Sequence, residues 1–267
     1  MRTHEQTVHD QFDPKAEAYL HSTVHAQGPD LAHAAGLVGR AIPPSGTALD
    51  VGCGAGHLSF ALASRLERVV AVDPSARMLE TVATAAAVRG LQQIETHQAG
   101  AESLPFCDSA FDLVATRFSA HHWRSVESGI HEMRRVLAPR GYLLVIDVLG
   151  HEDPLVDTHL QTMELLRDPS HVRNRSACEW RKFLAAAGFE DVQEMQWSLR
   201  LDFQSWIERM RTPPLQASTI RELQRSAARE VQEMLAFEAD GSFSVRTGLF
   251  WARRPAAPPA PARSALG

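Results

Sequence analysis

The chain has 267 residues, of which 44% are hydrophobic and 22% charged, a composition that excludes a mainly disordered, collagen-like or coiled-coil protein. Its formal net charge is −5 and it has no cluster of Lys and Arg, so the sequence shows no basic surface for binding nucleic acid. No run of apolar residues approaches the roughly 18 that a membrane helix needs. The N-terminus is polar and partly acidic, which argues against a signal peptide. We therefore expect a cytoplasmic protein without a membrane partner.

Strand and helix patterns alternate through the first half of the chain. A helix is expected over residues 30–41. Between residues 46 and 149, short β-branched runs then alternate with helical patterns, and strands are expected at 48–51, 69–72, 111–116 and 142–148, with a weaker one near Ile94. This alternation is the signature of a parallel sheet wrapped by helices.

Two helices between these strands have clear end signals. Ser75 can accept a hydrogen bond from the first-turn N–H groups of a helix that runs to about Arg89. Apolar residues recur at helical spacing over residues 126–137, and Pro139 and Gly141 are expected to end that helix before the next strand.

The pattern changes after Gly150. Ser176 and Glu179 form a capping box that opens a helix ending near Gly188. Two strands are expected at 192–201 and 243–251, and between them lie about forty residues with helical patterns at 203–210 and 218–237, separated by a Pro-Pro pair. An insertion of that size between neighbouring strands is uncommon unless it covers something.

A glycine loop follows the first strand and opens a helix, in the run Leu49-Asp50-Val51-Gly52-Cys53-Gly54-Ala55-Gly56-His57. Glycines here let the backbone approach a ligand closely, but the dinucleotide pattern G-x-G-x-x-G fails because its sixth position is His57. Asp50 would repel a phosphate and could bind a cation, while Asp73, at the end of the next strand, stands where a carboxylate can accept both ribose hydroxyls. S-adenosylmethionine combines an ammonium group, a carboxylate and a nucleoside, and it fits this environment.

Five segments, in order and at the right spacings, resemble the motifs of a class I S-adenosylmethionine-dependent methyltransferase, of the branch that includes the ubiquinone and menaquinone C-methyltransferases. They are residues 50–56, 72–75 with Met78, 101–106, 111–114 and 136–143. The resemblance implies an α/β fold, a Rossmann-like, doubly wound, mostly parallel seven-stranded sheet with helices on both faces and an antiparallel last strand.

The motif order, the long insertion and the composition of the tail together predict an organisation in four parts. These are a helical cap at 1–44, an S-adenosylmethionine-binding core at 45–150, a part at 151–254 that completes the sheet and carries a helical lid at about 203–237, and a Pro/Ala-rich, disordered tail at 255–267.

The family's motifs also assign roles to single positions of this sequence. The resemblance implies that Gly52, Cys53 and Gly54 offer backbone to the methionine part and that Asp73 holds the ribose, with Asp50 beside the loop. It places Pro74 and Met78 against the adenine, Ala101 and Glu102 beside its polar edge, and Arg117 and Phe118 in the wall after the fourth strand. Gly100 departs from the pattern, because related proteins often have an acid there that contacts the adenine amino group.

The segment after the fourth strand is the best place for a catalytic base, which methyl transfer needs only if the nucleophile has a proton to lose. Adjacent side chains usually point in different directions, so at most one of His121 and His122 should face the substrate. The resemblance favours His122. A histidine that only shapes the loop is the equal alternative. Tyr19, with Phe12 and His25, lies in an N-terminal segment that in related proteins folds over the cofactor, sometimes onto a neighbouring subunit. Simple packing of Tyr19 is again the equal alternative.

The sequence therefore predicts methyl transfer from S-adenosylmethionine to a carbon or oxygen atom of a small molecule, in a chain that forms a homo-oligomer if its N-terminal segment reaches a neighbour. An NAD(P)-dependent oxidoreductase and a cofactor-binding module without turnover are the alternatives. The 13 histidines and 3 cysteines give no convincing metal pattern, although His21 and His25 have i, i+4 spacing, so no metal is predicted.

Overall fold

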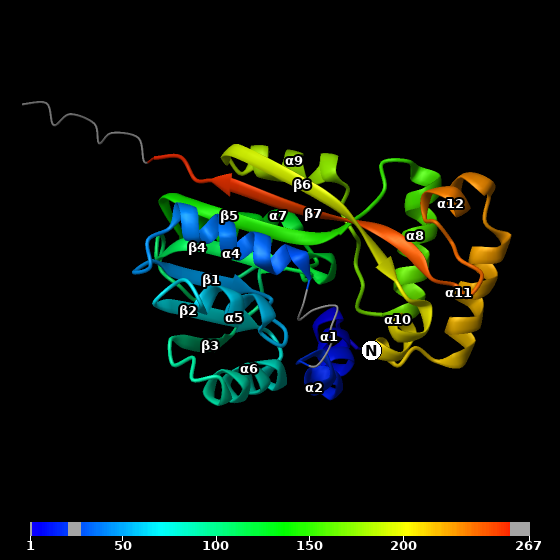
Figure 1. Ribbon diagram of the computed structural model, residues 1–267, viewed down its shortest axis with the longest axis horizontal. Coiled ribbons are helices and arrows are strands. Elements are labelled where there is room, and N and C mark those ends of the chain that lie inside the picture. Colours follow the sequence, from blue (N-terminus) through cyan, green and yellow to red (C-terminus); the bar gives the residue numbers. More distant parts are fainter. Residues whose placement is uncertain (1, 21–27, 257–267) are drawn as a thin grey trace, which may run out of the picture.

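One seven-stranded sheet organises the computed structural model, which describes residues 2–20 and 28–256 (Figure 1). The strand order is β3-β2-β1-β4-β5-β7-β6, with β1 to β5 parallel and β7 antiparallel to both β5 and β6. The strands are β1 (Thr47–Val51), β2 (Arg68–Asp73), β3 (Ile94–Gln98), β4 (Phe111–Arg117), β5 (Leu137–Leu149), β6 (Glu190–Leu201) and β7 (Phe243–Arg253). The predicted fold class, including the antiparallel last strand, is confirmed.

Helices cover both faces of this sheet (Figure 1). The helices α4 (Pro29–Ala41) and α5 (His57–Ala63) pack on one face through a cluster that includes Val38 and Leu62. On the other face, α7 (Val126–Val136) and α9 (Ala177–Ala186) bury residues such as Met133 and Trp180. The helix α6 (Ala76–Val88) follows β2, with Ser75 as its N-cap as predicted.

Two predicted boundaries are wrong. The strand β5 begins at Leu137, because Pro139 disfavours a helical conformation at the residue before it and the chain is already extended at Leu137. The helix expected at 218–237 is two helices, α11 (Pro214–Ser226) and α12 (Arg229–Met234). Proline is tolerated at the first helical position, so α11 already begins at Pro214. The break between α11 and α12 comes at the extended residues Ala227 and Ala228.

Four helices form a second body around the far ends of β6 and β7, which we call the helical half (Figure 1). They are α8 (Pro154–Arg167), α10 (Phe203–Met210), α11 and α12. Their buried cluster, which includes Leu160, Trp206, Ile220 and Phe243, is separate from the clusters on the two faces of the sheet. The insertion after β6 thus has a small core of its own.

The N-terminal segment, residues 2–20, comprises α1 (His4–Phe12), a 3-10 turn η1 (Asp13–Lys15) and α2 (Ala16–Leu20). It is tied to both halves: the Ser75 hydroxyl donates to Asp13 (2.5 Å), and the Tyr19 hydroxyl donates to the sulfur of Met210 in α10 (2.9 Å). His21 and His25 lie outside the described residues, as do residues 257–267 of the predicted tail. None of the helices described is long and apolar enough to cross a membrane.

Candidate functional site

A large cavity of about 600 Å³ opens at the carboxyl ends of β1, β2 and β4. Ligands of open α/β sheets bind at this edge. All of the predicted site residues line the cavity: Tyr19, Asp50, Gly52, Cys53, Gly54, Asp73, Pro74, Met78, Ala101, Glu102, Arg117, Phe118 and His122. Residues that are far apart in the sequence are therefore brought together around one space.

The backbone of the glycine loop presents few free donors to this space. The N–H groups of Gly52 and Cys53 both donate to the carbonyl of Val72 (2.8 and 2.9 Å), and that of Gly54 donates to Asp73 (2.9 Å). Gly54 adopts φ +50°, and a Cβ there would meet nothing within 4 Å, so a ligand has room to approach. A pyrophosphate needs such N–H groups, whereas the loop as built favours a group that donates hydrogen bonds.

Asp50 and Asp73 are buried carboxyl groups beside the loop. Asp50 is 1% exposed and accepts from the Ser59 hydroxyl (2.6 Å), while its other oxygen, Oδ1, has no hydrogen-bond partner among the described residues. Burial raises the pKa of Asp50 to about 7 and that of Asp73 to about 6. A buried oxygen without a donor is costly, so an ammonium or hydroxyl group of a ligand would be stabilised here.

The wall after β4 contains a strained residue. Phe118 has φ +51°, which is uncommon for a residue other than glycine, and its N–H donates to the carbonyl of Ile146 (2.8 Å). Arg117 forms a buried ion pair with Asp30 of α4, and its guanidinium lies 4.5 Å from the centre of the Phe118 ring. These contacts hold the wall in a conformation that the local sequence alone would not favour.

Two further residues of the cavity have structural partners. Glu102 accepts from the N–H of Arg124 (3.0 Å), so its carboxylate fixes the turn before α7. The Trp123 indole donates to the Ser119 hydroxyl (3.0 Å) and belongs to the buried cluster under the sheet, as expected of a packing residue.

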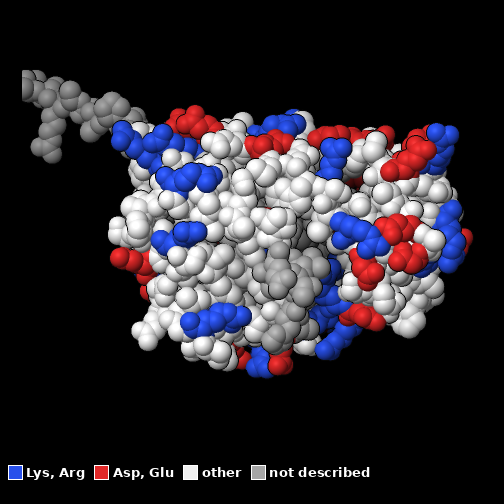
Figure 2. All heavy atoms as spheres, viewed as in Figure 1, with Lys and Arg blue, Asp and Glu red and all other residues white. Residues whose placement is uncertain are grey.

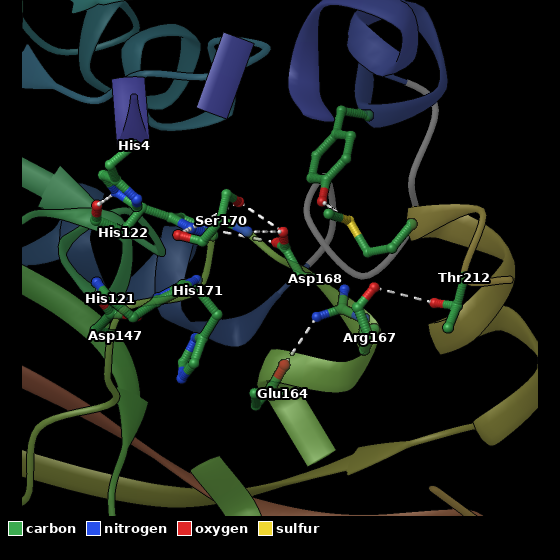
Figure 3. A network of polar contacts seen from close by, with 12 residues as sticks. His4, His121, His122, Asp147, Glu164, Arg167, Asp168, Ser170, His171 and Thr212 are labelled. Carbon is green, nitrogen blue, oxygen red and sulfur yellow. Dashed lines mark hydrogen bonds and ion pairs between the residues drawn. The ribbon is translucent and has the colours of Figure 1, made fainter. Parts of the chain in front are cut away.

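The two adjacent histidines lie on a 3-10 turn, η2 (Ala120–His122), and their ring centroids are only 4.2 Å apart (Figure 3). The expectation that they point two ways is therefore wrong. His121 Nδ1 contacts Asp147 (2.6 Å); although burial opposes its protonation, the charge of Asp147 and this bond raise the pKa of His121. His122 Nδ1 donates to the Ser170 carbonyl (3.1 Å), and burial lowers the pKa of His122 to about 3.

A second, small cavity of about 80 Å³ adjoins the large one. The two share Phe12, Tyr19, Phe118 and His122. The small cavity is also lined by charged and polar residues that sequence reasoning missed, among them Glu164, Arg167, Asp168, His171 and Arg209. They come from α8, the segment after it and α10, where a run of charges looks like an ordinary solvated face, so no motif marked them.

The N-terminal segment closes the space above both cavities. His4 Nε2 donates to the carbonyl of His122 (2.9 Å), and the Phe12 ring stands edge-on to the His122 ring, 5.0 Å between centroids (Figure 3 shows His4 and His122). His57 Nε2 donates to the carbonyl of Tyr19 (3.0 Å). Residues of the N-terminal segment thus contribute to the lining of both cavities.

Histidines gather near this site without forming a metal centre. Across residues 2–20 and 28–256, no group of three or more His, Cys, Asp or Glu side chains is placed to hold a metal ion. His171 instead contacts the amide oxygen of Gln161 (2.8 Å), and burial lowers its pKa to about 3.

Comparison with known proteins gives consistent matches. The model of the methyltransferase domain family matches residues 49–145. The uncharacterised protein YafE of Escherichia coli K12 is 45% identical over 71% of this chain and 91% of its own length, and the uncharacterised methyltransferase YcgJ of Bacillus subtilis is 35% identical over 76% and 79%. The crystal structure of a putative methyltransferase from Bacillus halodurans superimposes with a TM-score of 0.81 and 30% identity, covering 85% of this chain and all of that one.

Proposed function

Because this chain belongs to the methyltransferase domain family and is an S-adenosylmethionine-dependent methyltransferase, we propose that it methylates a small molecule bound in the small cavity. One observation carries this proposal. The large cavity, with its loop and two acids, meets the small one at four shared residues, so a donor in the first and an acceptor in the second would face each other. The net charge of −5 suits a small acceptor better than a nucleic acid.

The residues of the large cavity fit the cofactor. We infer that Asp50 and the carbonyl groups of Gly52 to Gly54 receive its ammonium group, that Asp73 accepts the ribose hydroxyls with its remaining lone pairs, and that Pro74 and Met78 flank the adenine. Ala101 and Glu102 stand at the polar edge of the base, and Arg117 and Phe118 form the wall. When bound, S-adenosylmethionine supplies a methyl group on a positively charged sulfur, which is already activated for in-line displacement.

The chain's own contribution is then to align the acceptor and exclude water. Orientation of this kind can contribute on the order of 7 to 11 kcal/mol. Phe12 and Tyr19 of the N-terminal segment stand with His122 at the junction of the cavities. We propose that Tyr19 and His122 contact the acceptor.

If the acceptor has a proton to lose, His121 is the better placed to take it. His122 is neutral with a pKa of about 3, which makes it a weak base at neutral pH, whereas Asp147 orients His121 and stabilises its protonated form. His121 lines the small cavity, where the acceptor would lie. His122 then acts through shape and polarity.

Ligand-dependent melting tests the proposed cofactor. S-adenosylhomocysteine at ~100 times its dissociation constant should add about 2.7 kcal/mol to the free energy of unfolding and raise the melting temperature, with NAD and NADP as controls. Stabilisation by the nicotinamide cofactors alone would favour an oxidoreductase. Release of S-adenosylhomocysteine with a panel of small acceptors then separates an enzyme from a binding module, which would bind the cofactor but never turn over.

The organisation of the chain is consistent with separate parts for the cofactor and the acceptor. We propose that residues 1–44 act as the cap, 45–150 as the cofactor-binding core and 151–254 as the part that completes the sheet and carries the lid at about 203–237. Carbon and oxygen remain the proposed acceptor atoms, and a cytoplasmic location agrees with the composition.

A further inference from the structure

We propose that the methyl acceptor carries an oxyanion, a carboxylate or a phosphate, which Arg209 binds at the small cavity. This inference rests on the proposed function, because it assigns the acceptor to that cavity. It concerns the chemical class of the acceptor, which the glycine loop and the cofactor residues do not determine.

Arg209 and Arg167 both line the small cavity, but only Arg167 has hydrogen-bond partners for its guanidinium among the described residues. Arg167 donates to Glu164 (2.9 Å) and to the carbonyl of Trp206 (3.0 Å), and its guanidinium lies 4.8 Å from the centre of the Trp206 ring. The Nε atom of Arg209 is buried without a hydrogen-bond partner, and this guanidinium forms no ion pair with any residue of the described ranges. Burial lowers the pKa of Arg209, which means that burying the positive charge of its guanidinium is unfavourable here.

The acids that could neutralise Arg209 are already engaged. The Glu164 carboxylate pairs with Arg167 (Figure 3). Asp168 accepts at Oδ1 from both the N–H (2.9 Å) and the hydroxyl (2.5 Å) of Ser170, and its Oδ2 lies 4.0 Å from His122 Nε2. Neither acid pairs with Arg209, so an anionic acceptor would find there a guanidinium whose planar fork matches a carboxylate or phosphate.

Further cations lie nearby. Lys15 is 5% exposed and close enough to Asp168, Arg211 and Arg167 for their charges to affect its pKa, and burial lowers that pKa to about 8. Neither Lys15 nor Arg211 forms an ion pair within the described part of the chain, although Arg211 donates to the carbonyl of Pro14 (3.4 Å). Figure 2 shows Lys and Arg side chains gathered between the grey residues and the helical half. In a chain of net charge −5, this local excess of positive charge favours an anion.

Three small probes test the inference on the full chain saturated with S-adenosylhomocysteine. Propionate, its neutral counterpart propionamide and methyl phosphate are titrated at matched ionic strength, and binding is followed by ligand-observed NMR. We expect propionate or methyl phosphate to bind at least about tenfold more tightly than propionamide, since hydrogen bonds to charged groups are worth that much. The stronger of the two anions identifies the oxyanion as carboxylate or phosphate.

Matched variants assign the site. Arg209→Gln should weaken binding of the preferred anion about tenfold, and Arg209→Lys should restore only part of it because the fork is lost. Arg229→Gln, which removes an exposed arginine paired with Glu233 on α12, should change nothing. Equal binding of propionate, methyl phosphate and propionamide, or unchanged anion binding in Arg209→Gln, would overturn the inference. Failure of S-adenosylhomocysteine itself to bind would instead overturn the proposed function.

Discussion

Two buried carboxyl groups, Asp50 and Asp73, should make cofactor binding depend on pH if they hold the cofactor as proposed. Asp50 and Asp73 must be ionised to accept hydrogen bonds from an ammonium group and from hydroxyls, and burial raises their pKa values to about 7 and about 6. The affinity for S-adenosylhomocysteine should therefore fall as the pH decreases from 8 to 5.5, first through Asp50 and then through Asp73. Titration calorimetry across this range checks the prediction, and an affinity that stays constant would contradict it.

The same burial predicts an opposite effect on the stability of the ligand-free protein. Both folded-state pKa values exceed the value of ~3.9 for an unfolded Asp, so between about pH 4 and 7 the folded state binds more protons and its free energy of unfolding rises as the pH falls. Asp50→Asn removes this buried charge. It should raise the melting temperature of the ligand-free protein at pH 8 and weaken binding of S-adenosylhomocysteine. The exposed Asp108→Asn is the control, and a variant that melts lower with unchanged affinity would refute this role for Asp50.

The histidine pair predicts which residue controls the pH profile of turnover. Asp147 raises the pKa of His121 above its usual 6.5, so activity should increase with pH as His121 loses its proton. Asp147→Asn should shift that rise to lower pH and reduce the maximal rate by ~10²-fold. His122→Gln should keep the position of the rise, because His122 is neutral throughout this range. A profile that moves with His122 and not with Asp147 would assign the base to His122.

Among the elements, those of the N-terminal segment bury few side chains. No residue of α1 is buried, and η1 and α2 bury only Lys15 and Ala16 among their described side chains. Segments with few buried contacts open at low free energy. Amide exchange over residues 4–20 should therefore be fast in the ligand-free chain and slow down when S-adenosylhomocysteine is bound, as mass spectrometry can measure. Equal exchange in both states would show that the segment does not cover the cofactor.

Sequence patterns predicted the elements best where local signals determine them. The Ser75 cap and the Ser176 capping box place α6 and α9 correctly, and the glycine loop and acids of the parallel strands led directly to the large cavity. The polar lining of the small cavity could not be predicted in this way. Glu164 and Arg209 lie on helices whose charges look solvated, and they line the cavity because α8 and α10 pack together in the core of the helical half. Similarly, the Asp147 partner of His121 comes from a neighbouring strand, which no local spacing reveals.

At the scale of the whole molecule, the two halves have different tasks. The sheet half supplies the loop and acids of the large cavity, and the helical half supplies the charged lining of the small one. Their buried clusters are separate, and they are connected by β6, β7 and the N-terminal segment. A substitution that damages the core of the helical half should consequently impair binding of the acceptor more than binding of the cofactor.

Trp206→Ala tests this separation. The Trp206 ring packs against Phe203 and Phe243 (centroids 6.2 and 4.9 Å apart), supports the Arg167 guanidinium and lines the small cavity. Removing it should cost about 3 to 5 kcal/mol of stability, as for other buried tryptophans. Methyl transfer should be largely lost, while the dissociation constant of S-adenosylhomocysteine stays within about twofold, because distant sites couple weakly. Loss of cofactor binding in a variant that calorimetry shows to be folded would mean that the two cavities form one cooperative unit.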